Sequence, residues 1–240
     1  MPMFHLIAFD ADDTLWDNES LYVRIQDEFR QLLSSYLDPE PVQQVLDEIE
    51  QRNLHYFGYG IKSFALSMIE TAIELTDGRI RGTDIRTIIG FAKRMKETPV
   101  QLLDHAADTI ALLARSYELM LITKGDLLDQ EAKIAGSGLA DSFKYVEIVS
   151  EKDKQTYETL LARYAIIPEH FLMVGNSLRS DVLPVVAMGA QAVYIPHHTT
   201  WVHEIVQDHD EEDGSYFRLD HIGMLPALVE ELTSDRLASK

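Results

Sequence analysis

Five short, nearly continuous apolar runs set the strongest constraint on how this chain folds. Each has the length of a β-strand buried on both faces, and helical patterns separate the later runs. The apolar runs are 3–9, 119–123, 145–149, 171–175 and 192–196, and the helical patterns are 126–139, 156–164 and 181–188. This alternation predicts an α/β fold, a doubly wound parallel sheet with helices on both faces and right-handed crossovers.

Residues 17–98 interrupt the alternation because they carry only helical periodicity. Four apolar stripes follow one another there, and the clearest, 61–73, ends at Gly78. Asp38 and Pro39 predict the start of the second helix. We therefore expect an all-helical domain at 17–98, inserted into a core made of 1–16 and 99–240.

Composition excludes several classes of function. The chain has 240 residues, and 21 Lys and Arg against 40 Asp and Glu give a net charge of −19. Nucleic acid and anionic membranes would be repelled by this charge. The chain contains no cysteine, which excludes disulfides, thiolate metal sites and Cys nucleophiles. No stretch of 18 apolar residues occurs, so we expect a cytoplasmic protein that does not enter membranes.

Two aspartates stand at the end of the first apolar run. Strand alternation predicts that Asp10 and Asp12 point to one side, and that Asp13 points away from it. Like charges ~4 Å apart cost about 4 kcal/mol at an effective dielectric of 20, so the pair needs a proton or a cation such as Mg²⁺. A turn cluster is the alternative, because Asp is common in turns. An EF-hand is excluded, since Leu15 stands where that loop needs Gly.

Polar segments also follow three later strands. They are Thr123 to Asp126, Ser150 to Lys154 and Gly175 to Asp181. Ligands of open parallel sheets bind at the carboxyl ends of the strands, so these segments and Asp10 should converge.

Together and in this order, the segments resemble the haloacid dehalogenase superfamily. Its four motifs are a DxDx(T/V) strand end, a Ser or Thr, a Lys, and an acidic loop. The resemblance carried by DADDTLWD and VGNSLRSDV spans Phe4 to Pro196. It implies a Rossmann-type catalytic core, with the helical insertion as a cap hinged near Asp17 and Thr98.

The resemblance also implies catalytic roles. Asp10 would be the nucleophile that forms an aspartyl-phosphate, and Asp12 would be the general acid and base. Thr123 and Lys152 would hold phosphoryl oxygens, although Lys154 is an alternative for the lysine. We favour Lys152 because it stands 24 residues before Asn176, which is close to the spacing that is usual in the family. The residues expected to bind the substrate are Thr14, Thr123, Lys124, Gly125 and Lys152.

The implied cofactor is Mg²⁺, held by Asp10, the backbone carbonyl of Asp12, Asn176 and Asp181. Asn176 departs from the family pattern, which usually has an acid at that position, so metal binding would depend more on Asp181. Asp13 departs too, because Gly is frequent there, and we expect Asp13 only to cap the turn.

Histidines near the C-terminal end do not form a recognisable metal motif. His197, His198, His203 and His209 lack the HExxH spacing, so a surface loop is the simpler interpretation. The acidic block from Asp208 to Asp213 is interpreted as a solvated loop.

The resulting hypothesis is a magnesium-dependent phosphomonoesterase for a small soluble phosphate ester. A hydrolytic 2-haloacid dehalogenase is an alternative that Asp12 argues against, because those enzymes lack the second Asp. A phosphotransferase or mutase shares the first half-reaction. A catalytically silent acidic interaction module is the non-enzymatic alternative. Neither the substrate nor the oligomeric state can be inferred from the sequence.

Overall fold

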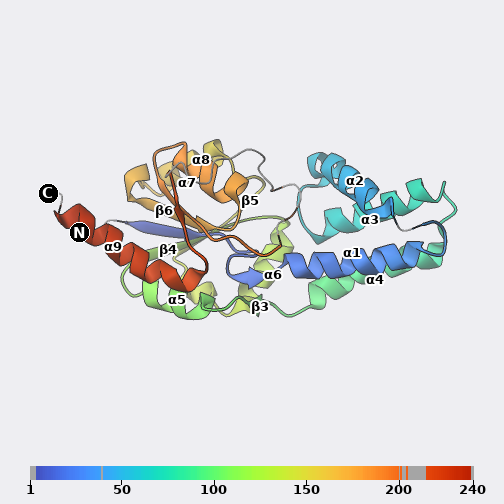
Figure 1. The fold of residues 1–240 in the computed structure, drawn as a ribbon, viewed down its shortest axis with the longest axis horizontal. Coiled ribbons are helices and arrows are strands. Elements are labelled where there is room, and N and C mark those ends of the chain that lie inside the picture. Colours follow the sequence, from blue (N-terminus) through green and yellow to red (C-terminus); the bar gives the residue numbers. More distant parts are fainter. Residues whose placement is uncertain (1–3, 39, 200, 202–203, 205–214, 239–240) are drawn as a thin grey trace. The chain divides into compact units, whose positions relative to one another are not determined.

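The computed structural model describes residues 4–38, 40–199, 201, 204 and 215–238 (Figure 1). The chain divides into two compact units. The core unit consists of Met1–Asp17, Val100–Lys124 and Lys133–Lys240, and the helical unit consists of Asn18–Pro99 and Gly125–Ala132. Within the described ranges, no helix has both the length and the apolar character that a membrane crossing needs.

The core unit is built on a six-stranded sheet with the order β5-β4-β1-β6-β7-β8, and every neighbouring pair is parallel. The strands are β1 (Leu6–Phe9), β4 (Glu118–Lys124), β5 (Tyr145–Val149), β6 (Phe171–Gly175), β7 (Gln191–Tyr194) and β8 (Phe217–Arg218). All five apolar runs form strands, which confirms the predicted fold class; β8 was not predicted. Strand β1 lies between β4 and β6, so the residue after it enters the middle of the sheet's carboxyl edge.

Alternate residues of β1 pack into two separate hydrophobic clusters. Leu6 and Ala8 pack with Tyr157 and Val185, which belong to α7 (Lys154–Arg163) and α8 (Leu183–Val186). Ile7 and Phe9 instead pack with residues of α5 (Ala106–Leu113) and α9 (Leu225–Ala238). Figure 1 shows these two pairs of helices on opposite faces of the sheet. The alternation of strand side chains therefore produces the layered fold.

A second, two-stranded sheet joins the points where the helical insertion leaves and re-enters the core. Strand β2 (Trp16–Asp17) pairs antiparallel with β3 (Gln101–Leu102), and Trp16 lies opposite Leu102. The pair is too short for sequence alternation to reveal it.

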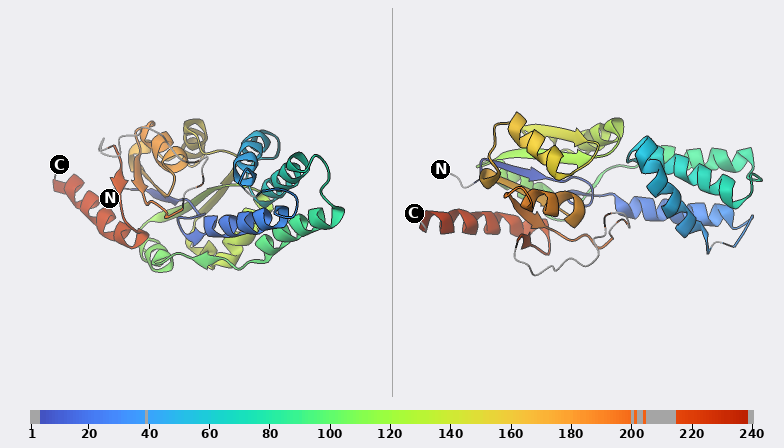
Figure 2. Two further views of the ribbon diagram at one scale, coloured as in Figure 1. Left: turned by 45° about the vertical axis from the view of Figure 1, so that its right-hand side comes forward. Right: turned by 90° about the horizontal axis from the view of Figure 1, so that it is seen from above.

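The helical unit contains α1 (Glu19–Leu33), α2 (Val42–Phe57), α3 (Ile61–Leu75) and α4 (Gly82–Glu97), which pack side by side around one apolar cluster (Figure 2). Phe29, Met68 and Ile88 are fully buried in that cluster. The second helix begins later than predicted. The residue that directly precedes its first turn is Pro41, and not Asp38. Pro39 lies outside the described residues.

Residues 125–132 were predicted to be part of the core, but they group with the helical unit. Two ion pairs connect this segment to the helical unit. Asp126 pairs with Lys62 at 2.7 Å, and Asp129 pairs with Lys96. Helix α6 (Leu127–Ser137) therefore starts in the helical unit and ends in the core unit.

Candidate active site

Asp10 directly follows β1 and lies at the carboxyl edge of the sheet. Its backbone N–H donates to the carbonyl of Val174 on β6 at 2.9 Å, which extends the strand ladder by one residue. The side chain is buried, with 7% of the residue exposed. Burial of a carboxylate needs partners, because an unpaired buried charge is costly.

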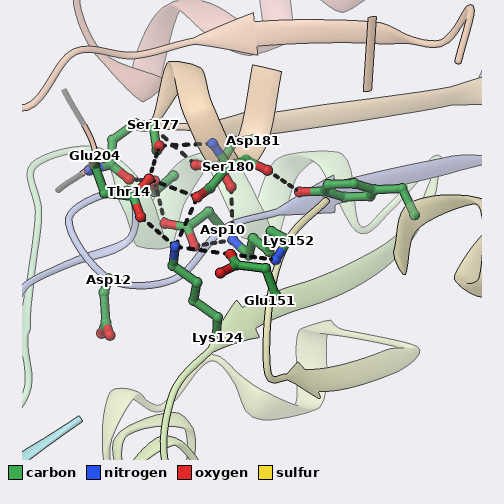
Figure 3. A network of polar contacts seen from close by, with 12 residues as sticks. Asp10, Asp12, Thr14, Lys124, Glu151, Lys152, Ser177, Ser180, Asp181 and Glu204 are labelled. Carbon is green, nitrogen blue, oxygen red and sulfur yellow. Dashed lines mark hydrogen bonds and ion pairs between the residues drawn. The ribbon is translucent and has the colours of Figure 1, made fainter. Parts of the chain in front are cut away.

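One lysine and two aspartates form the centre of the site (Figure 3). The Nζ atom of Lys152 donates to Asp10 Oδ1, and it donates to Asp181 Oδ1 at 2.8 Å. Lys152 is 3% exposed, whereas the side chain of Lys154 is 52% exposed and pairs with Glu158 on the surface of α7. Of the two candidate lysines, Lys152 therefore lies against the predicted nucleophile.

The charges of this cluster do not balance. Two carboxylates face one ammonium, which leaves one negative charge in excess. Burial raises the pKa of Asp10 to about 7, although Lys152 opposes the shift. Burial alone would lower the pKa of Lys152, but the attraction of Asp10 and Asp181 outweighs it and raises that pKa. The cluster is thus suited to binding a further cation or a proton on Asp10.

Oxygen atoms converge on the other side of Asp10. Thr14 Oγ1 donates to Asp10 Oδ2 at 2.9 Å. One terminal amide atom of Asn176 lies 3.1 Å from Thr14 Oγ1, 3.1 Å from Asp10 Oδ2 and 3.2 Å from the backbone carbonyl oxygen of Asp12. As NH₂ that group donates to these oxygens; as a carbonyl oxygen it joins them around a cation. Oxygens about 3 Å apart match neighbouring ligands of octahedral Mg²⁺, so these residues fit that metal.

Asp181 has a different environment from the one expected for a metal ligand. Its Oδ1 accepts from Lys152 at 2.8 Å, its Oδ2 accepts from the backbone N–H of Ser177 at 3.0 Å, and it is 1% exposed. Gly175 provides the space, since a Cβ there would lie 2.2 Å from Asp181 Oδ2. These contacts orient Lys152 and the turn at Ser177, and the role of Asp181 as a metal ligand stays a prediction.

The Asp12 side chain does not share a crevice with Asp10 as strand alternation predicted. Both carboxylate oxygens accept from Lys133 at 2.6 Å, and Oδ1 also accepts from Trp16 Nε1 at 2.6 Å. Figure 3 shows this carboxylate directed away from the Asp10 cluster. The strand ends before it, because Leu15 N–H donates to the Ala11 carbonyl at 2.8 Å and the chain turns. The Asp12 side chain is 21% exposed.

The predicted substrate-binding residues fall into three environments. Thr123 is the last residue but one of β4 and is 1% exposed. Thr14 is 2% exposed and engaged with Asp10, which makes it a positioning group for that carboxylate. Gly125 has φ +147°, a conformation that a larger side chain rarely adopts.

Lys124 contacts Glu204, a residue that the sequence analysis did not single out. Its Nζ atom donates to Ser180 Oγ at 2.9 Å and to the carboxylate of Glu204, which also accepts from Ser180 at 2.7 Å and from Ser177. Burial opposes ionisation of Glu204, but Lys124, together with the hydrogen bonds from Ser177 and Ser180, outweighs it and lowers the pKa of Glu204. Glu204 and Lys133 were both missed, because neither lies in a motif and each acts on a residue far away in the sequence.

The turn after Asp12 explains why glycine is frequent at position 13. Asp13 has φ +63°, which is in the left-handed region that glycine favours. It is buried rather than exposed, and its Oδ1 lies 3.7 Å from Nδ1 of His197. His203, His209 and the block Asp208 to Asp213 lie outside the described residues.

Comparison with known proteins agrees with this geometry. The family model for haloacid dehalogenase-like hydrolases matches residues 4–189. A solved haloacid dehalogenase-like hydrolase from Xanthomonas campestris is 40% identical with a TM-score of 0.88, over 99% of this chain and 95% of that chain. A 2-haloacid dehalogenase from Pseudomonas syringae pv. Tomato DC3000 shares the fold, with 21% identity, a TM-score of 0.63, and coverage of 96% and 100%.

Two curated relatives are phosphatases. The 5-amino-6-(5-phospho-D-ribitylamino)uracil phosphatase YigB of Escherichia coli K12 is 24% identical over 79% of this chain and 82% of its own length. A glyceraldehyde 3-phosphate phosphatase of Methanothermobacter thermautotrophicus is 30% identical over 44% of this chain and 47% of its own length. The family match and the shared fold lead to one conclusion: the chain belongs to the haloacid dehalogenase-like hydrolases.

Proposed function

We propose that this hydrolase is a magnesium-dependent phosphomonoesterase that acts on a small soluble phosphate ester. The observation that carries the proposal is the placement of Asp10, held by Lys152 and Thr14 beside an oxygen-rich site, with Asp12 close in the chain but separately anchored. The names of the two phosphatase relatives support the same reaction class.

In the first half of the proposed reaction, a carboxylate oxygen of Asp10 attacks phosphorus and the bond to the leaving oxygen breaks. Asp12 gives its proton to that oxygen, which leaves as an alcohol. The product on the enzyme is an aspartyl-phosphate at Asp10. Lys152 and Thr123 offset the charge on the phosphoryl oxygens, in the way that preorganised donors stabilise such transition states.

In the second half, Asp12 takes a proton from water, and the oxygen of that water attacks phosphorus. The bond between phosphorus and Asp10 breaks, which restores the carboxylate. Lys133 and Trp16 hold the Asp12 carboxylate in place for both transfers. Mg²⁺, held by Asp10, the carbonyl of Asp12 and Asn176, would offset the charge of the phosphoryl group.

We also propose that the helical unit is the cap that encloses the substrate and contacts the leaving group. A cytoplasmic location is part of this proposal, because the chain has no cysteine and therefore no disulfide that a reducing compartment would break.

Hydrolysis of p-nitrophenyl phosphate by the full chain tests the proposal. We expect turnover with Mg²⁺, its loss with EDTA, and its loss in Asp12→Asn, with Lys154→Ala as an active control. A dehalogenase would release halide from a 2-haloacid in metal-free buffer and leave the phosphate ester intact. A mutase would isomerise a sugar phosphate faster than it releases phosphate. Either result would contradict the proposal.

A further inference from the structure

A second group of ligating side chains lies in the core unit beside the proposed catalytic machinery. Asp13, Asp17 and His197 each place one ligating atom within 4.8 Å of the other two. They come from the turn after β1, from the end of β2 and from the segment after β7. None of the three has a role in the proposed reaction.

The group contains buried polar atoms without partners. The side chain of His197 is 5% exposed, and its Nε2 atom is buried and accepts or donates no hydrogen bond. The Oδ1 atom of Asp17 is also buried and has no hydrogen-bond partner. A buried polar atom without a partner is costly, so it needs an explanation, and a bound ion supplies one.

One ring nitrogen of His197 faces both Thr199 and Asp13. Its Nδ1 atom lies 2.9 Å from the carbonyl oxygen of Thr199, 3.4 Å from the backbone nitrogen of the same residue, and 3.7 Å from Asp13 Oδ1. In the tautomer with the proton on Nδ1, the Thr199 carbonyl satisfies that proton, and the lone pair is on Nε2, which has no hydrogen-bond partner. Metal-ligating histidines commonly donate their other ring N–H to a carbonyl in this way.

The charge of the ligand set also suits a dication. Asp13 and Asp17 supply two carboxylates beside one imidazole, which is a ligand set that divalent transition metals accept.

We propose that Asp13, Asp17 and His197 bind a divalent transition metal ion, with Zn²⁺ as the best match to one imidazole nitrogen and two carboxylate oxygens. This site is separate from the Mg²⁺ ligands inferred above, which are all oxygens. The ion would fasten the segment after β7 to the turn that follows the nucleophile.

Titration of the full chain with CoCl₂, in excess Mg²⁺ and followed by visible absorption, tests this proposal. We expect one equivalent of Co²⁺ to bind, with the spectrum of nitrogen and oxygen ligation. Asp13→Gly should weaken binding at least tenfold while folding normally, because glycine adopts φ +63° without strain. His197→Ala should weaken it similarly.

Two variants serve as controls. Asp77→Gly replaces another aspartate of positive φ, +50°, whose side chain is exposed, and should bind Co²⁺ like the unmodified protein. Asp10→Asn should also retain binding. The proposal is wrong if the unmodified protein binds no Co²⁺ in excess Mg²⁺, or if Asp13→Gly binds as well as the unmodified protein. Loss in Asp10→Asn with retention in Asp13→Gly would assign the ion to the Asp10 site and overturn it equally.

Discussion

Each unit of the molecule buries an aspartate, and the two have opposite electrostatic environments. Asp84 in the helical unit is 6% exposed, and Arg81 Nε donates to it at 2.9 Å, with Tyr36 as a second donor. The hydrogen bond from Arg81 holds the pKa of Asp84 below its usual range. In the core unit, burial raises the pKa of Asp10 to about 7.

The difference separates a structural carboxylate from a reactive one. Asp84 has a guanidinium of its own, so its charge is matched where it lies. Asp10 shares one ammonium with Asp181, so its ionised form is held at a higher free energy. Strongly perturbed carboxylates gather at functional sites, and we therefore expect chemistry in the core unit and selectivity in the helical unit.

Substitution of Asp10 and of Asp84 tests this difference most directly. Asp10→Asn should lower turnover of an aryl phosphate by about 10⁴-fold or more, because an amide cannot form the acyl-phosphate. Asp84→Asn should keep kcat within about twofold, because it removes only a structural contact. Steady-state kinetics on both variants gives the answer, and equal losses would refute the division of roles.

The position of the phosphate label identifies the nucleophile. Asp12→Asn retains Asp10 and should still accept a phosphoryl group from a substrate with a good leaving group. Mass spectrometry should find the phosphate on Asp10. A label on Asp13 or on a serine would contradict the assignment.

The two lysines near β5 should differ next most strongly. Lys152→Ala should lower kcat by about 10²–10³-fold, since it removes a buried charge-assisted contact to the phosphoryl group and to Asp10. Lys154→Ala is the matched control, because its ammonium lies on the surface, 3.8 Å from Glu158. A larger loss in Lys154→Ala would show that the spacing argument and the observed contact are both misleading.

Stability should depend on pH through Asp10. The pKa of Asp10 is about 7 in the folded protein, against 3.8 ordinarily, so the folded state holds the proton more tightly between those values. In EDTA, the free energy of unfolding should fall by on the order of 1–3 kcal/mol as pH rises from about 4 to 7. Urea titrations of the unmodified protein and of Asp10→Asn isolate this contribution. An equally steep fall in Asp10→Asn would assign the effect to another group.

The helical unit should influence which ester is used. Phe57 at the end of α2 is 53% exposed, and Tyr56 beside it is 75% exposed, so α2 ends in two exposed aromatic side chains. Phe57→Ser should change kcat/KM among phosphorylated metabolites by about tenfold and leave p-nitrophenyl phosphate nearly unaffected. Ile73→Ser is the control, with 47% exposure on α3. Identical metabolite profiles for both variants would contradict the proposed cap role.

The smallest effect is expected at the metal ligands. Asn176→Asp restores a charge beside Asp10 and should lower the Mg²⁺ concentration for half-maximal rate by about three- to tenfold. Asn176→Ala should raise that concentration. An unchanged value in Asn176→Asp would mean that position 176 does not face the metal.

The sequence predicted the layered core because strand residues such as Leu6 and Ile7 alternate between two apolar clusters. It did not predict the direction of Asp12, since alternation holds only while the chain stays extended. Asp13, with φ +63°, shows that the chain has already turned. Glu204 acts on Lys124, 80 residues away, and such pairs leave no local periodicity.

The excess charge around Asp10 has a consequence for the lifetime of the protein. If Mg²⁺ restores the balance, metal affinity becomes part of the stability of the core unit, because only the folded chain assembles the ligands. A cation present at 100 times its dissociation constant adds about 2.7 kcal/mol to the free energy of unfolding. Proteases that degrade the unfolded chain would then act faster when free Mg²⁺ falls, so the abundance of this enzyme would follow the availability of the proposed metal ion.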